Sequence, residues 1–113
     1  MSKSPDRGDL VWVDFAPQAG HEQAGHRPAL VISPLPYHHR SKLAVVCPIT
    51  SNVDPWPWKV LLPEGLAISG AVLADQVRSI PREGRRLRIA GHAPDEVLAE
   101  VQAKLAALLG ITL

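Results

Sequence analysis

Cysteine is nearly absent from this 113-residue chain, which contains only Cys47. A single thiol forms no disulfide within the chain, and it cannot supply the cysteine cluster of a structural zinc site. The five histidines give no metal site either, because no pair of them has a third ligand nearby at a recognisable spacing. We therefore expect a reduced, cytoplasmic protein that needs no metal and no other cofactor.

Long apolar runs are also missing from the sequence. No segment is long enough to cross a bilayer. Residues 1–7 form a short polar tail, which lacks the apolar core of a secretion signal. We expect a protein that neither spans a membrane nor is exported by a signal at this end, with residues 1–113 forming one domain.

A large excess of positive charge is missing as well. The chain has 12 Lys and Arg against 11 Asp and Glu, and its formal net charge is +1. This balance argues against a protein that coats nucleic acid through a broad basic surface. Five arginines nevertheless gather in one short segment: Arg78, Arg82, Arg85, Arg86 and Arg88. By charge pattern alone, this segment is a solvated surface balanced by the acidic residues near the C-terminal end.

Short apolar segments separated by turn residues make up most of the chain. Alternating or near-continuous apolar patterns predict strands at residues 9–15, 28–33, 43–49, 58–62, 70–73, 77–80 and 87–89. Residues 16–26 read as a loop, and the prolines in residues 34–40 favour a turn or a short helical piece. Such a pattern is typical of a small, strongly curved antiparallel sheet or a partly open barrel.

One helix is predicted, at the C-terminal end of the chain. Pro94 suits its first position, and Gly110 suits its C-terminal cap. The apolar residues on one side recur at helical spacing: Val97, Val101, Leu105 and Leu108. We expect this side to pack on the sheet, which gives a mainly β fold with a C-terminal helix.

Polar side chains stand where two predicted strands begin or end. Arg27 lies between the loop and the apolar segment that begins at Pro28, and Thr50, Ser51 and Asn52 follow the segment 43–49. A guanidinium fixed at a strand end presents a rigid fork of donors to a phosphate. If the two strand ends meet, they form a phosphate site. The alternatives are a surface arginine paired with Glu22 or Asp75 and a threonine that caps a turn.

Four blocks of the sequence resemble the MazF/PemK toxin endoribonucleases of bacterial toxin–antitoxin systems. They are Gly-Asp-Leu-Val-Trp-Val-Asp-Phe at 8–15, Glu-Gln-Ala-Gly-His-Arg-Pro at 22–28, Pro-Ile-Thr-Ser at 48–51 and Leu-Ala-Asp-Gln-Val-Arg-Ser-Ile at 73–80. Each block alone is weak evidence, but all four stand in the order found in the family. The resemblance covers nearly the whole chain from Gly8 to the predicted helix.

The resemblance implies a fold, an activity and partners. The fold is an SH3-like barrel with helices, and it works as a homodimer. The activity is metal-independent, sequence-selective cleavage of single-stranded RNA, chiefly mRNA, by the 2′-hydroxyl, which leaves a 2′,3′-cyclic phosphate and a 5′-hydroxyl. The partner is a MazE-like antitoxin, whose acidic tail occupies the RNA groove. Arg27 and Thr50 match the catalytic arginine and the catalytic threonine or serine of the family.

Further site residues are predicted around these two. His26 is the candidate for proton transfer, because an unperturbed imidazole titrates near neutrality, whereas His21, His38 and His39 lie in predicted loops without a matched partner. The residues expected to bind RNA are Glu22, Ser51, Asn52, Trp56, Gln76 and Arg78. Trp56 is framed by prolines and suits base stacking, while Trp58 suits the core. For His26 the alternative is an exposed polar residue, and for Gln76 a hydrogen-bonded turn.

Two other functions are compatible with the same fold. One is a non-catalytic toxin that binds and inhibits a topoisomerase, as related toxins of this architecture do. The other is a regulatory RNA-binding module that has lost cleavage. The presence of both Arg27 and Thr50 favours the endoribonuclease.

Overall fold

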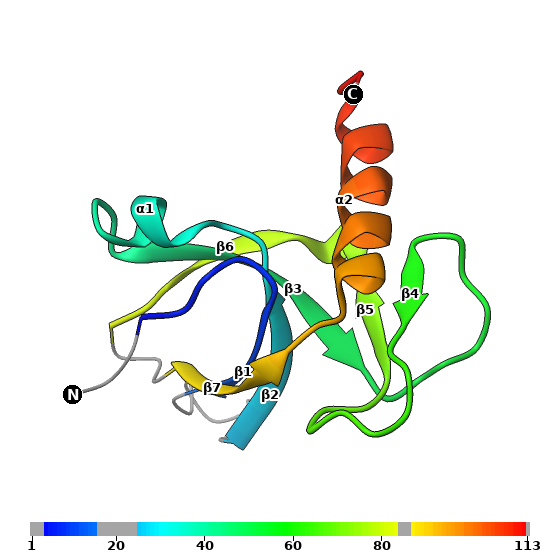
Figure 1. The fold of residues 1–113 in the computed structure, drawn as a ribbon, viewed down its shortest axis with the longest axis horizontal. Helices are drawn as coiled ribbons and strands as arrows, with labels where there is room; N and C mark the ends of the chain where they lie inside the picture. Colours follow the sequence, from blue (N-terminus) through cyan, green and yellow to red (C-terminus); the bar gives the residue numbers. More distant parts are fainter. Residues whose placement is uncertain (1–3, 16–24, 84–86, 113) are drawn as a thin grey trace, which may run out of the picture.

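The computed structural model describes residues 4–15, 25–83 and 87–112, which form a curled antiparallel sheet and a C-terminal helix (Figure 1). The elements are, in chain order, β1 (Asp9–Phe15), β2 (Gly25–Val31), α1 (Leu35–His38), β3 (Leu43–Thr50), β4 (Lys59–Leu61), β5 (Ala71–Leu73), the 3₁₀ helix η1 (Ala74–Gln76), β6 (Arg78–Pro81), β7 (Leu87–His92) and α2 (Asp95–Leu109). The strands pair in the order β4-β5-β3-β2-β1-β7, and β6 pairs with β3 outside this path. The predicted fold, mainly β with a C-terminal helix, is confirmed.

Strand β3 contacts three other strands. Along one edge its residues 43–46 pair with β6, and its last two residues, Ile49 and Thr50, pair with β5. Along the other edge its residues 46–48 pair with β2. Thr50 therefore lies just beyond the point where the partner of β3 changes from β6 to β5.

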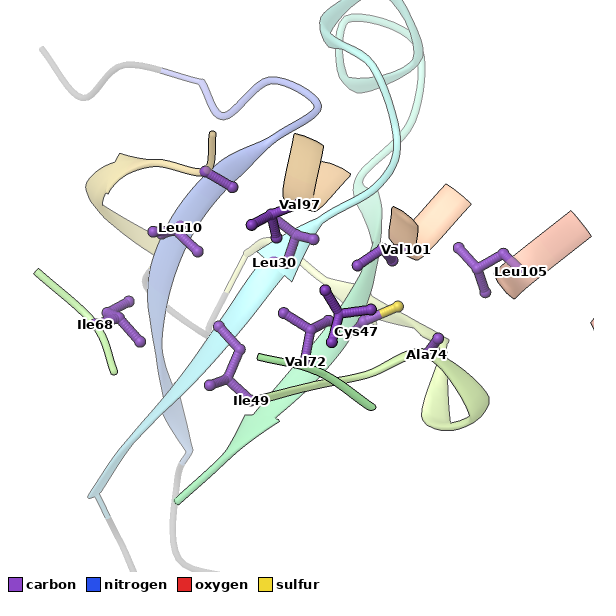
Figure 2. Close-up of a cluster of buried hydrophobic side chains, with 12 residues drawn as sticks. Leu10, Leu30, Cys47, Ile49, Ile68, Val72, Ala74, Val97, Val101 and Leu105 are labelled. Carbon is purple, nitrogen blue, oxygen red and sulfur yellow. The ribbon is translucent and has the colours of Figure 1, made fainter. Parts of the chain in front are cut away.

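The central strands β1, β2 and β3 bury side chains on both faces of the sheet, which explains the near-continuous apolar runs of the sequence. Successive strand residues point to opposite faces. Leu10 and Leu30 accordingly pack with Val101 of α2 in a core cluster between sheet and helix (Figure 2). Their neighbours Val11 and Val31 belong to a second cluster on the other face of the sheet.

Helix α2 begins one residue later than predicted and leaves its last turn exposed. Pro94 precedes the first helical residue, Asp95, and Gly110 ends the helix with a left-handed φ of 73°. Leu108 was expected on the packed side, but it is 41% exposed. The C-terminal end of the helix projects beyond the strands (Figure 1), which agrees with the exposure of its last turn. No helix within the described ranges is long and apolar enough to cross a membrane.

Strand β2 begins earlier than the sequence pattern indicated. Gly25, His26 and Arg27 belong to it, because they pair with Phe15, Asp14 and Val13 of β1. Pairing with an apolar neighbouring strand overrides the weak strand preference of glycine and of charged residues. Arg27 therefore lies within a strand rather than at the junction of loop and strand.

His38 is buried rather than exposed in a loop, which corrects the expectation from sequence. It ends α1, and its Nδ1 lies 2.7 Å from the carbonyl oxygen of Pro5 while its Nε2 lies 2.6 Å from Ser33 Oγ. The Ser33 hydroxyl in turn accepts the backbone N–H of Val45 at 2.8 Å. His38 thus ties the N-terminal segment to the start of β3, and its role is structural.

Candidate active site

Arg27 of β2 and Thr50 of the neighbouring strand β3 line the same pocket. The register of β2 and β3 pairs Val31 with Val46 and Ala29 with Pro48. Arg27 and Thr50 each lie two residues beyond the last of these pairs, so alternation puts each on the same side of its strand as Ala29 and Pro48. Two residues that stand 23 positions apart in the sequence are therefore brought to one place by strand pairing.

The same face also receives Arg78. This residue stands opposite Val46 in the register of β6 and β3, and Val46 lies two and four residues before Pro48 and Thr50, on their side of β3. A pocket of about 640 Å³ is lined by Arg27, Thr50 and Arg78 together with Ser51 and Gln76. Its floor is apolar and comes from the second core cluster: Val13, Ala29, Val46 and Ile80. Two cationic side chains above an apolar floor suit a phosphate carried by a larger, partly apolar ligand.

The guanidinium of Arg27 is available to a ligand. It is exposed, and among the residues that the structure describes it has no hydrogen-bond or ion-pair partner. Of the two partners considered from sequence, Glu22 lies outside the described residues, and Asp75 bonds Trp56 instead. A planar fork of donors held on a strand grips a phosphate with little further loss of conformational entropy.

Thr50 is held in place through both its side chain and its backbone. The backbone N–H of Asn52 donates to Thr50 Oγ1 at 3.1 Å, which leaves the hydroxyl hydrogen for a ligand. Gly70, at φ +123°, approaches so closely that an added Cβ would stand 2.2 Å from the carbonyl oxygen of Thr50. Gly70 is a site residue that our sequence analysis missed. A glycine at the start of a predicted apolar strand was the available signal.

His26 lies on the opposite face of β2 from Arg27. Its Nδ1 contacts Asp14 Oδ1 of β1, and Nη2 of Arg88 from β7 lies 3.0 Å from the same nitrogen and 3.8 Å from the same carboxylate. One ring nitrogen cannot both donate to Asp14 and accept from Arg88, so the protonation of His26 selects its partner. Our sequence analysis did not join Asp14 and Arg88 to His26, because only the register of three strands brings them together.

Of the predicted RNA-binding residues, Glu22 lies outside the described part of the chain, and the other five divide into two groups. Ser51, Gln76 and Arg78 line the pocket. Asn52 and Trp56 are not among its lining residues, and they lie in the loop between β3 and β4. Asn52 Oδ1 accepts the backbone N–H of Asp54 at 2.9 Å and Lys59 Nζ at 3.3 Å, so its carbonyl group shapes the loop.

No group of three or more His, Cys, Asp or Glu side chains in the described part of the chain is arranged to hold a metal ion. The single thiol offers no ligand to the pocket either. Burial, with a smaller contribution from the charge of Asp75, raises the pKa of Cys47 to about 12. The thiol is therefore neutral at physiological pH and buried in the core.

Residues 6–109 match the family described as PemK-like, MazF-like toxin of type II toxin–antitoxin system. The chain belongs to this family. It is 42% identical to the endoribonuclease toxin MazF of Escherichia coli K12, over 94% of this chain and 95% of the relative. It is 32% identical to the endoribonuclease PemK of Escherichia coli, over 92% and 81% of the two chains. The resemblance inferred from the four sequence blocks is thus confirmed.

Solved structures of the same family agree with the fold. A crystal structure of MazE–MazF from Deinococcus radiodurans superposes with a TM-score of 0.92 at 50% identity and covers 98% of this chain and 100% of the other. A crystal structure of MazF alone from the same organism gives a TM-score of 0.85 at 50% identity, over 97% and 100%. The curled sheet with its C-terminal helix is therefore the MazF fold.

Proposed function

We propose that Arg27 and Thr50 bind the scissile phosphate of single-stranded RNA in a metal-independent cleavage reaction. The chain is a MazF-like endoribonuclease toxin of a toxin–antitoxin system, and its relatives carry the names of endoribonucleases. The observation that supports this site is that Arg27 and Thr50 line one pocket at the adjacent strands β2 and β3. Arg27 has no partner among the described residues, which leaves its donors for the phosphate.

In this reaction the RNA supplies its own nucleophile. The 2′-oxygen loses its proton and attacks phosphorus, and the bond from phosphorus to the 5′-oxygen breaks as that oxygen gains a proton. The products are a 2′,3′-cyclic phosphate and a 5′-hydroxyl. Arg27 stabilises the charge that develops on the phosphate oxygens through two parallel hydrogen bonds, and the Thr50 hydroxyl donates a third. Arg27 is a poor base at neutral pH, because its pKa stays above about 12.

His26 remains our candidate for the proton transfers, at the edge of the pocket. It is among the lining residues, but strand alternation separates its ring from the side of β2 that carries Arg27. We therefore assign it a smaller part in catalysis than Arg27. The RNA outside the scissile phosphate contacts Ser51, Gln76 and Arg78 in the pocket, and Asn52 and Trp56 in the adjacent loop.

The partners we propose follow from the same site. Three of the matching structures are described as MazE–MazF from Deinococcus radiodurans. An acidic, extended antitoxin segment suits a groove that carries Arg27 and Arg78, and it competes there with RNA. We propose that the protein acts in the cytoplasm as a homodimer.

The decisive experiment is cleavage of a mixed-sequence RNA in excess EDTA, followed by analysis of the end groups. We expect 2′,3′-cyclic phosphate and 5′-hydroxyl ends, and no product with the Arg27→Ala variant. Absence of cleavage by the folded protein would contradict the proposal. That result would favour a topoisomerase inhibitor or an RNA-binding module, which a supercoiling assay and an RNA-binding assay distinguish.

A further inference from the structure

The loop between β3 and β4 is fixed by side chains from outside it. Lys59 Nζ donates to the carbonyl oxygen of Asp54 at 2.9 Å, and Lys104 Nζ of α2 donates to the carbonyl oxygen of Pro57 at 2.5 Å. The loop starts at Ser51, which lines the pocket. A loop with this many anchors presents its side chains in a defined arrangement.

Trp56 is the residue that this loop exposes. Trp56 is 49% exposed, whereas Trp58, two positions later, is partly buried. The indole of Trp56 is nevertheless tethered, because Nε1 donates to Asp75 Oδ2 at 3.2 Å. A ring that is half open to solvent but anchored at its polar edge offers a π-face at low entropic cost.

Asp75 links this ring to a segment that lines the pocket. It belongs to η1, and the next residue, Gln76, lines the pocket. The second oxygen of Asp75, Oδ1, is buried and has no hydrogen-bond partner within the described residues. A buried acceptor without a partner destabilises the fold, so the placement of this carboxylate calls for an explanation other than stability.

We propose that Asp75 is a positioning residue that fixes Trp56 as a stacking platform for a base next to the scissile phosphate, and thereby sets the sequence preference of cleavage. The inference rests on the proposed function, since it assigns a specificity device to the same RNA site. Stacking by itself accepts every base, because every base presents a π-face. The platform therefore selects among bases only if the indole is held at one angle.

The test uses two variants that break the same hydrogen bond from opposite sides. Trp56→Phe keeps an aromatic face but loses the N–H donor, and Asp75→Ala removes the acceptor. Each full-length variant is incubated with an RNA pool randomised around the cleavage site, and the products are sequenced. We expect both to show the same relaxed preference at one position, and Asp75→Ala, which leaves the ring in place, to keep kcat on the favoured RNA within about threefold of wild type. Trp56→Ala, which loses the ring itself, should raise KM by roughly 5- to 100-fold.

Two controls separate positioning from a structural role. Asp75→Asn retains an oxygen that accepts from the indole, so it should restore the wild-type preference. Lys104→Met removes a neighbouring anchor of the same loop without touching Trp56 or Asp75, and we expect its preference to be unchanged. An equal change in Lys104→Met would overturn the proposal, because any loosening of the loop would then have the effect.

The remaining outcomes are also decisive. Unchanged preference in both Trp56→Phe and Asp75→Ala would overturn the role of the tether while leaving the proposed endoribonuclease intact. A loss of kcat on all RNAs alike in both variants would show a structural role and would overturn it as well. Failure of the wild-type protein to cleave any RNA would instead contradict the proposed function, which makes the two failures distinguishable.

Discussion

Arg27 and Thr50 serve one phosphate in the proposed mechanism, but they differ in what they donate. Arg27 offers a charged, bidentate pair of donors, and Thr50 offers a single neutral hydroxyl. Removing one oxyanion donor typically costs a factor of about 10²–10³ in rate. We expect Thr50→Ala to fall in this range and Arg27→Ala to lose more, as measured by single-turnover cleavage of a short RNA.

The double variant and a conservative replacement sharpen this prediction. Because both residues act on the same phosphate, Arg27→Ala combined with Thr50→Ala should lose less than the product of the separate losses. Arg27→Lys keeps the charge but not the planar fork, so it should stay well below wild type. Circular dichroism serves as the control for folding. Wild-type rates in either alanine variant would remove that residue from the mechanism.

His26 can be compared with a second histidine of similar surroundings. His92 is also exposed, and its Nδ1 lies 3.0 Å from Asp9 Oδ1, but it is not among the residues that line the pocket. Acid–base catalysis contributes about 10²–10⁴ in rate, and we expect His26→Gln to lose about 10² because the ring lies on the face away from Arg27. His92→Gln should cleave as wild type does. Equal rates in the two variants would exclude His26 from proton transfer.

Among the secondary-structure elements, the turn before β5 constrains the position of Thr50. Gly70 and Gly65 both have positive φ, at 123° and 93°, but a Cβ at Gly65 meets nothing within 4 Å, whereas one at Gly70 would stand 2.2 Å from the Thr50 carbonyl oxygen. Gly65→Ala should cost about 1–3 kcal/mol from backbone strain alone.

Gly70→Ala should lower the free energy of unfolding by more than Gly65→Ala does, and it should also slow cleavage. Thermal unfolding gives the first quantity, and single-turnover cleavage gives the second. If Gly70→Ala is as stable and as active as Gly65→Ala, then β5 does not position Thr50 through this close approach.

The elements themselves were predictable to the extent that apolar periodicity determines them. The strands containing Leu10, Leu30 and Val46, and the helix that buries Val97 and Val101, follow from spacing. The early start of β2 did not follow from spacing, because its first residues, a glycine and two polar residues, belong to the strand only through their pairing with β1. The burial of His38 and the exposure of Leu108 were missed for a related reason, since both depend on which neighbouring segment covers the side chain.

The candidate site was predictable in part. Arg27, Thr50, Ser51, Gln76 and Arg78 were identified from motifs, and the structure brings them to one pocket. The close approach of Gly70 and the contact between Asp14 and His26 depend on strand register. Register depends on turn geometry and on pairings between residues distant in the sequence. The apolar pattern of a single sequence does not reveal these pairings.

For the whole molecule we predict a homodimer. The chain is small for a stable core, and the family resemblance implies two subunits. Light scattering at micromolar concentration should give about twice the chain mass of 12.2 kDa. A monomer with full cleavage activity would contradict this.

The antitoxin complex should weaken with salt, because exposed charges are screened over about 8 Å at physiological ionic strength.

The burial of both sheet faces has a consequence for folding fidelity. In a sheet with one wet face, a slip of one residue exposes apolar side chains and is rejected. Here a slip of β3 by one residue exchanges one apolar set for another, so burial alone discriminates poorly between the two arrangements. Pro28 and Pro48 restrict which registers can form, because each lacks the backbone N–H that donates a hydrogen bond to a neighbouring strand. A chain that slipped would still look folded, but Thr50 would face away from Arg27. Specific activity, rather than secondary-structure content, is therefore the proper measure of correct folding in any preparation of this toxin.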